Sequence, residues 1–160
     1  MENSTSQSNF AVVLRQQSTG EVLLAATNIF LSITACLGNA LILIALRKVT
    51  SVHPPTKLLF RCLALTDICV GLITQPLAVI SFLNAIPPKV YWYVFKARIA
   101  TSVILCGVSG LTSTAISVDR LLALLLGQTY RHVVTLKRVR GVIFFVWIIA
   151  VCIILTHFVF

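Results

Sequence analysis

The chain alternates between long apolar runs and short polar segments. Each of the long runs holds at most one charged residue: Val22 to Leu46, Cys62 to Pro88, Ile99 to Val118 and Gly141 to Phe160. An α-helix needs about 20 residues to cross the roughly 30 Å of hydrocarbon in a bilayer, and each run approaches or exceeds that length. The pattern predicts an all-α membrane protein with transmembrane helices at about 22–46, 58–86, 96–126 and 140–160.

The composition supports a membrane protein, and the charges orient it. The chain is 58% hydrophobic and 11% charged, with a mean hydropathy of +0.99, which argues against a soluble domain. The net charge of +9 is not interleaved with a soluble aromatic platform, so it does not predict nucleic-acid binding. Short segments rich in lysine and arginine stay in the cytosol, which places the N-terminus outside and the basic segments beside anionic lipid. These residues are Arg47, Lys48, Lys57 and Arg61 after the first run, and Arg120, Arg131, Lys137, Arg138 and Arg140 after the third.

Residues 1–21 are polar and are predicted to form a flexible extracellular tail. They lack the basic start and short apolar core of a cleavable signal peptide, so we expect the first span to serve as a signal anchor. The tripeptide Asn3-Ser4-Thr5 fits the acceptor pattern for N-glycosylation, which makes Asn3 a candidate site. Such short patterns also arise by chance.

The polar residues do not form the pattern of an enzyme or a metal centre. They include no nucleophile–base pair and no phosphate-binding loop, and they lie at membrane depth. The five cysteines have neither metal-ligand nor CxxC spacing, so we interpret them as small buried apolar residues. The prediction is a protein without enzymatic activity, resident metal or organic cofactor.

Asp67 is an acid inside an apolar run, where a carboxylate costs roughly 2.5–3.5 kcal/mol. We interpret it as an ion site, a proton site or a switch element that faces the interior of a helix bundle. Pro76 follows about two turns later and predicts a bend in the outer half of the same helix. A bent helix beside a buried acid favours a pocket between helices.

The third run is the most polar inside, which predicts that its helix is central and touches neighbours on several sides. Its hydroxyls are Ser102, Ser109, Thr112, Ser113, Thr114 and Ser117. Ser109 lies at the expected depth of Asp67, so the two side chains could share a cation such as Na⁺ if their helices adjoin. The alternative, a bond from Ser109 to a backbone carbonyl of its own helix, remains equally open.

Two further marks lie in the first and fourth runs. Gly38 permits close helix approach, and the amide of Asn39 needs a partner in hydrocarbon. Trp147 is either a packing residue or a lipid contact. Each mark is weak when it is taken alone.

Together these residues resemble the rhodopsin-like (class A) family of G-protein-coupled receptors over Val22 to Phe160. The ordered motifs are Gly38-Asn39, Leu63-Ala64-Leu65-Thr66-Asp67, Ala115-Ile116-Ser117-Val118-Asp119-Arg120, and Trp147. The resemblance implies that 22–160 is a partial seven-transmembrane receptor domain in the plasma membrane, with an extracellular ligand and a heterotrimeric G protein as partners. It gives Gly38, Pro76 and Trp147 structural roles.

The resemblance also implies two functional clusters. Asp67, with Asn39 and Ser109, is similar to the polar cluster that often holds a sodium ion in the family's inactive state. Asp119 and Arg120 are similar to the family's acid–arginine pair, in which the arginine is held at rest and meets the G protein when active. Tyr130 and Arg131 stand in the loop where the family also touches its G protein.

The chain departs from the family at three positions. Leu121 replaces the tyrosine that usually follows the arginine, and Phe95 replaces the cysteine that usually forms a disulfide with the second outer loop, so we expect that bond to be absent. Ser102 stands where amine receptors carry an acid, which predicts that the ligand is not a biogenic amine.

The expected function is transduction of extracellular ligand binding to a G protein, by a chain that we expect to be a fragment of a longer receptor. The alternative is an independent four-span membrane protein. It would be a small transporter that uses Asp67 as a proton or cation relay, or a non-signalling partner of full-length receptors.

Overall fold

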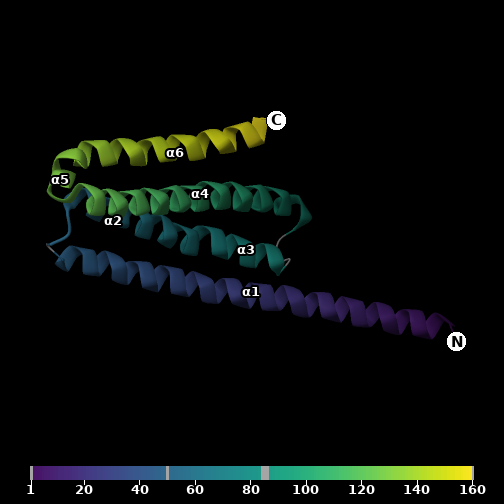
Figure 1. Cartoon of the computed structure of the whole chain (residues 1–160). Helices are drawn as coiled ribbons and strands as arrows, with labels where there is room; N and C mark the ends of the chain where they lie inside the picture. The colour runs from purple at the N-terminus through teal and green to yellow at the C-terminus, as the bar shows by residue number, and fades with distance from the viewer. Residues whose placement is uncertain (1, 50, 84–86, 160) are drawn as a thin grey trace.

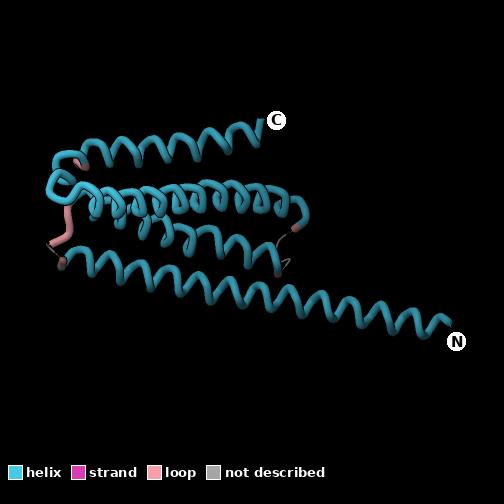
Figure 2. Tube along the Cα trace, viewed as in Figure 1, coloured by secondary structure: helices cyan, strands magenta, loops and turns pink. Residues whose placement is uncertain are grey.

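The computed structural model describes residues 2–49, 51–83 and 87–159, with side chains between residues 18 and 156 except at Pro88. The described backbone is helical and contains no strand (Figures 1 and 2). Its α-helices are α1 (Glu2–Lys48), α2 (Pro54–Cys69), α3 (Gln75–Phe82), α4 (Pro88–Leu126), α5 (Tyr130–Val133) and α6 (Leu136–Val159). A π-helical segment (Val70–Thr74) joins α2 to α3, and a 3-10 turn (Gly127–Thr129) joins α4 to α5.

Four helical segments in the described part of the chain are long and apolar enough to span a membrane. They are Ser18–Lys48, Pro54–Phe82, Lys89–Val133 and Leu136–Thr156. This confirms the predicted all-α membrane bundle.

The first helix is longer than its apolar run, because it begins at Glu2 rather than near Val22. Where the sequence predicts a flexible tail, the structure continues α1 beyond the other helices (Figure 1). The segment contains no proline, and its one glycine, Gly20, does not interrupt the helical backbone.

The third span, α4, lies at the centre of the bundle and contacts α2, α3, the π-helical segment and α6. The first span packs against α2, α3 and the π-helical segment, so α1 and α6 lie on opposite sides of the others (Figure 1). The central position of α4 confirms the prediction made from its hydroxyl side chains. It also brings groups on α2 within reach of groups on α4.

The second span leaves α-helical geometry immediately before Pro76. The backbone N–H of Gln75 donates to the carbonyl of Val70, a bond that is one residue longer than the α-helical pattern. Pro76 has no N–H to donate, and the π-helical turn accommodates the break. The irregularity lies where the sequence predicts a bend.

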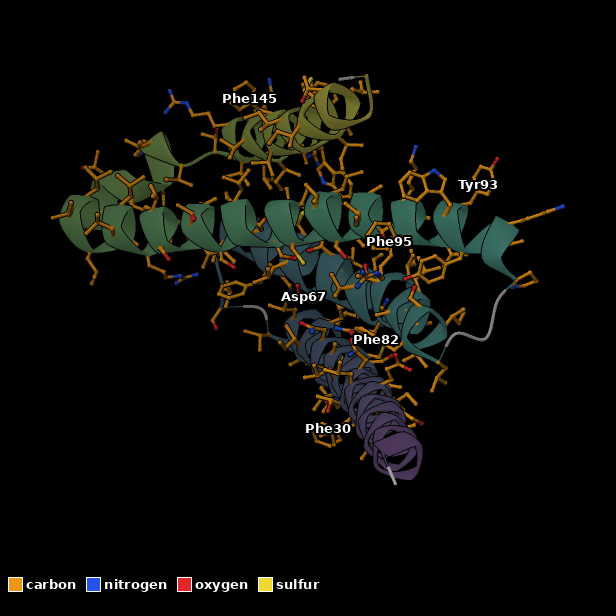
Figure 3. The ribbon with its side chains drawn as sticks, turned by 90° about the vertical axis from the view of Figure 1, so that its right-hand side faces the viewer. Phe30, Asp67, Phe82, Tyr93, Phe95 and Phe145 are labelled. Carbon is orange, nitrogen blue, oxygen red and sulfur yellow. The ribbon has the colours of Figure 1, made fainter. Side chains whose placement is uncertain are left out.

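Most large apolar side chains face outward, as expected for a bundle whose solvent is lipid. Figure 3 shows Phe30 on α1 and Phe145 on α6 on opposite outer faces, and their exposed fractions are 68% and 63%. The buried clusters are small: Leu59 with Tyr130, Val134 and Val139, and Val108 with Val146 and Ala150. Apolar burial alone therefore ties few parts of the helices together.

The second span approaches α1 closely at Gly71. A Cβ at this position would lie 2.8 Å from Cys36 Sγ and 3.0 Å from the Ser32 carbonyl oxygen. The Ser32 hydroxyl donates to the Gly71 carbonyl at 2.7 Å. Gly38, the glycine that the sequence favours for helix approach, is exposed and has nothing within 4 Å of its Cβ position.

We expect Gly71→Val to destabilise the bundle by about 1–3 kcal/mol, because the added side chain separates the two helices. Gly38→Val is the matched control, since it carries the same helix-propensity cost in open space. Thermal unfolding of the detergent-solubilised chain measures both variants. Equal losses of stability would contradict this assignment of the close contact.

Candidate functional site

A polar cluster joins the last turn of α2, in the middle of the second span, to the middle of α4. The Ser109 hydroxyl donates to Asp67 Oδ1 at 2.7 Å and lies 3.0 Å from Thr66 Oγ1. The hydroxyl of Thr66 donates to the carbonyl of Leu63 within its own helix at 2.8 Å. Of the two alternatives for Ser109, the structure therefore shows the bond to the carboxylate.

Asn39 is not hydrogen-bonded to this cluster. Its amide donates to the carbonyl of Ala35 at 2.9 Å, one turn earlier in α1. The structure thus joins Asp67 to Ser109 and leaves Asn39 bonded within its own helix. The described residues contain no group of three or more His, Cys, Asp or Glu side chains that could hold a metal. One carboxylate with hydroxyl oxygens is instead a ligand set for a hard cation.

A second polar cluster lies at the basic end of the bundle, around Asp119. This carboxylate is 4% exposed and accepts hydrogen bonds from the Tyr130 hydroxyl at 2.5 Å and the Thr56 hydroxyl at 2.8 Å. The two hydroxyl oxygens are 3.0 Å apart, so the three side chains form a closed triangle. The triangle ties α4 to the start of α2 and to α5.

Arg120 stands at the edge of this triangle. Its Nη2 lies 3.7 Å from Asp119 Oδ2, its side chain is 52% exposed, and its guanidinium lies 5.7 Å from the centre of the Phe60 ring. An exposed ion pair contributes about 0–1 kcal/mol, whereas a hydrogen bond to a charged group contributes about 1.5–3 kcal/mol. The hydroxyls therefore hold Asp119, and Arg120 is held loosely beside it.

The sequence does not identify three residues that contact this cluster: His53, Thr56 and Phe60. Thr56 is 1% exposed in the first turn of α2, and the His53 ring lies 5.3 Å from that of Tyr130. The one signal in the sequence is a threonine directly after two prolines, which favour the start of a helix. Nothing in the sequence indicates that its partner lies 63 residues away.

Among the described side chains, no hydrogen bond or ion pair joins the other predicted residues to either cluster. Arg131 is exposed on α5, and Trp147 is 37% exposed on α6, which favours the lipid-contact interpretation of the tryptophan. Pro76 lies at the irregularity of the second span. The side chain of Asn3 lies outside the described part of the structure.

Aromatic and basic side chains gather at the outer end of α3 and α4. The Arg98 guanidinium lies 5.8 Å from the centre of the Phe82 ring and 5.3 Å from that of Phe95. Figure 3 shows both rings at this end, with Asp67 deeper between the helices. Phe95, which replaces the family's cysteine, thus packs on a cation.

Comparison with known proteins shows which family the chain resembles. The family model described as 7 transmembrane receptor (rhodopsin family) matches residues 38–160. The alpha-2B adrenergic receptor of Talpa europaea is 32% identical over 86% of this chain and 34% of its own length. The corresponding receptor of Echinops telfairi is 31% identical over 81% of this chain and 34% of its own length.

A relative of another kind is equally similar. The adenosine receptor A2b of Homo sapiens is 31% identical over 88% of this chain and 41% of its own length. The chain therefore spans about a third of the adrenergic relatives and about two fifths of the adenosine one.

Tyr130→Phe and Thr56→Val should each destabilise the chain by about 1–3 kcal/mol, because each leaves the buried Asp119 with one donor fewer. The two losses should not add, since both hydroxyls bond the same carboxylate and their oxygens lie 3.0 Å apart. A double-mutant cycle of thermal stability measures this coupling. Tyr93→Phe is the control, because Tyr93 is 73% exposed at the outer end. Additive losses would argue against the closed triangle.

Proposed function

This chain belongs to the rhodopsin family of seven-transmembrane receptors, and we propose that it carries the switch through which a plasma-membrane receptor engages a heterotrimeric G protein. The observation that carries the proposal is that Asp119 is bound by more and stronger contacts than Arg120. The carboxylate is buried and doubly bonded to hydroxyls, while the guanidinium beside it is 52% exposed. The role is that of a receptor rather than an enzyme.

The geometry suits a change of partner by Arg120. Its ion pair is 3.7 Å long, and adjacent helical residues do not face each other, so little energy holds the guanidinium in place. An arginine stays charged and has a long reach, so it can turn from Asp119 to a carbonyl or carboxylate of a partner at the membrane surface. Asp119 then keeps its two hydroxyl donors and does not become a bare buried charge.

An outer ligand would act by shifting the equilibrium between the two states of the bundle. The polar cluster of Asp67 and Ser109 bridges α2 and α4 between the two ends of the membrane. A ligand that changes the packing of these helices at the outer end would therefore act on this bridge. We propose that a Na⁺ ion bound at Asp67 favours the resting state. Ser109 supplies a second oxygen, and Asn39 would have to leave its bond to Ala35 in order to contribute.

The outer half of α4 supports a proposal about the class of ligand. Adrenergic and adenosine receptors are both about 31% identical to this chain, so overall similarity does not choose between them. Ser102 has no charge to pair with a protonated amine. We therefore propose a ligand that is bound without an amine–carboxylate ion pair.

The direct test is G-protein activation by the full reading frame of the native transcript, expressed at the surface of cells. Arg120→Gln should reduce nucleotide exchange on the G protein at least about tenfold, the equivalent of one lost interaction of about 1.4 kcal/mol, with unchanged surface expression. Arg61→Gln removes an exposed cation from α2 and is the matched control. Full activation of the G protein by the Arg120→Gln variant would contradict the proposed switch.

Na⁺ should stabilise the chain more than K⁺ does, by about 1 kcal/mol when its concentration is about five times the dissociation constant. Asp67→Asn should abolish the difference and Ser109→Ala should reduce it, whereas Asn39→Ala should change it least. Thermal unfolding in matched NaCl and KCl measures the effect. A Na⁺ effect that survives in Asp67→Asn would rule out this site.

A further inference from the structure

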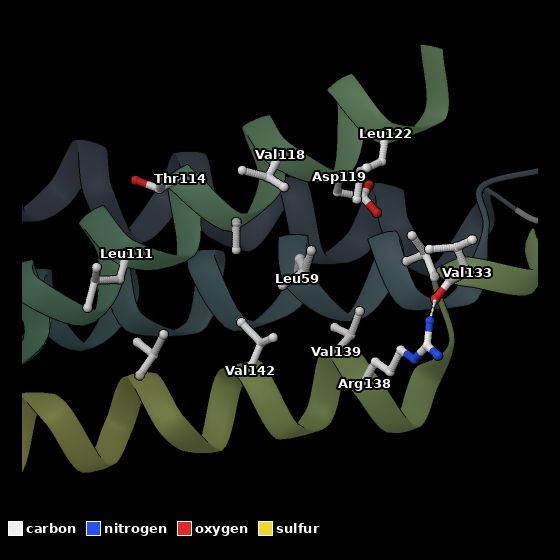
Figure 4. Close-up of a pocket in the computed structure, with 13 residues that line it drawn as sticks. Leu59, Leu111, Thr114, Val118, Asp119, Leu122, Val133, Arg138, Val139 and Val142 are labelled. Atoms are coloured by element: carbon white, nitrogen blue, oxygen red, sulfur yellow. Dashed lines mark hydrogen bonds between the residues drawn. The ribbon is translucent and has the colours of Figure 1, made fainter. Parts of the chain in front are cut away.

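An apolar groove runs along the bundle between α4 and α6, at the end where the basic residues gather. Its volume is about 440 Å³, and the start of α2 closes its floor through Leu59 (Figure 4). Leu111 and Val118 of α4 and Val142 of α6 line it and are 41%, 49% and 46% exposed. The groove therefore opens on the outer side of the four described spans, the side that lipid would reach.

The groove has the depth of one leaflet. Its lining on α4 extends from Leu111 to Leu122, which is about 16 Å at roughly 1.5 Å per helical residue. Half of a hydrocarbon core of roughly 30 Å is about the same length. A lipid tail that starts at the cytoplasmic interface would follow the groove to about the middle of the bilayer.

A fixed cation stands at the interfacial end of the groove. Arg138 Nη1 donates to the carbonyl of Val133 at 2.6 Å, and Figure 4 shows this bond at the end opposite Leu111. A guanidinium has five N–H donors, so this bond holds the group in place and leaves most donors available. No acid in the described part of the chain forms an ion pair with Arg138.

The charges around this end favour an anion. Arg131, Lys137 and Arg140 are exposed nearby in the sequence, on α5 and the first turns of α6. Asp119 also lines the groove, but it is 4% exposed and is bonded to two hydroxyls and paired with Arg120. An anionic group at Arg138 therefore meets a cationic surface.

We propose that this groove binds one anionic phospholipid of the cytoplasmic leaflet, with its phosphate on Arg138 and an acyl chain along α4 and α6. The guanidinium offers the phosphate paired, charge-assisted hydrogen bonds. The apolar walls receive a chain of the right length. Asp119 is the one groove residue that belongs to a polar cluster, and neither the phosphate contact nor the acyl-chain contact uses it, so the proposal does not depend on the proposed switch.

Native mass spectrometry of the detergent-solubilised full chain tests the site, with phosphatidylserine and phosphatidylcholine of identical acyl chains as probes. The first phosphatidylserine should bind about fivefold more tightly than phosphatidylcholine, the preference expected for one basic residue at an anionic surface. Arg138→Gln should remove this preference. Lys137→Gln deletes the same charge from the neighbouring position outside the groove, and it should change the preference less than about twofold.

A second pair of variants tests the apolar wall. Val142→Phe fills the groove and should weaken both lipids, whereas Val151→Phe makes the same change at an equally exposed position of α6 outside it. Unchanged circular dichroism verifies that the variants fold. Equal losses from Arg138→Gln and Lys137→Gln would overturn the proposal, as would undiminished binding by Val142→Phe. Displacement of phosphatidylserine by equimolar cholesterol would also overturn it, by assigning the groove to a neutral sterol.

Discussion

Inside a bilayer, a polar group that lacks a partner within the protein has no water to bond instead. Helix formation meets this requirement for the backbone of the spans, and side-chain bonds meet it for the few polar residues. The contact from Ser32 to Gly71 ties α1 to the second span, and Ser109 to Asp67 ties the second span to α4. Lipid tails are as apolar as leucine, so apolar packing alone does not drive these helices together. The polar bonds therefore specify that α1 adjoins the second span and that the second span adjoins α4.

The two bridges between α2 and α4 lie at different depths in the membrane and are built from different side chains. Near mid-membrane the bridge uses one hydroxyl and one carboxylate, whereas the cytoplasmic bridge uses the triangle of Thr56, Asp119 and Tyr130. The triangle also ties α5 to α4 through Tyr130. The backbone around Arg120 is therefore held in place, although the Arg120 side chain is held only by a long ion pair. An exposed guanidinium beside a buried, hydrogen-bonded carboxylate suits the switch that we propose.

The sequence predicts the spans well because length and apolarity are properties of single segments. It also predicts Asp119 and Tyr130 as members of one site, through the family resemblance. It does not predict Thr56 as their partner, nor Gly71 in place of Gly38 as the point of close approach. Both depend on how each helix is rotated about its own axis. In a soluble helix an apolar stripe reveals that rotation, but a helix that faces lipid is apolar on its outer side as well.

The two acids of the bundle differ in how fully they are satisfied, and this difference bears on the cation. A carboxylate has about four lone-pair sites. Asp119 receives two hydroxyl donors and has a guanidinium nearby, whereas the described residues give Asp67 one donor, the Ser109 hydroxyl. A charged carboxylate with one neutral donor is costly at this depth, and a monovalent cation would offset that cost without another protein charge. The described residues thus leave oxygen lone pairs of Asp67 available to the Na⁺ ion that we propose.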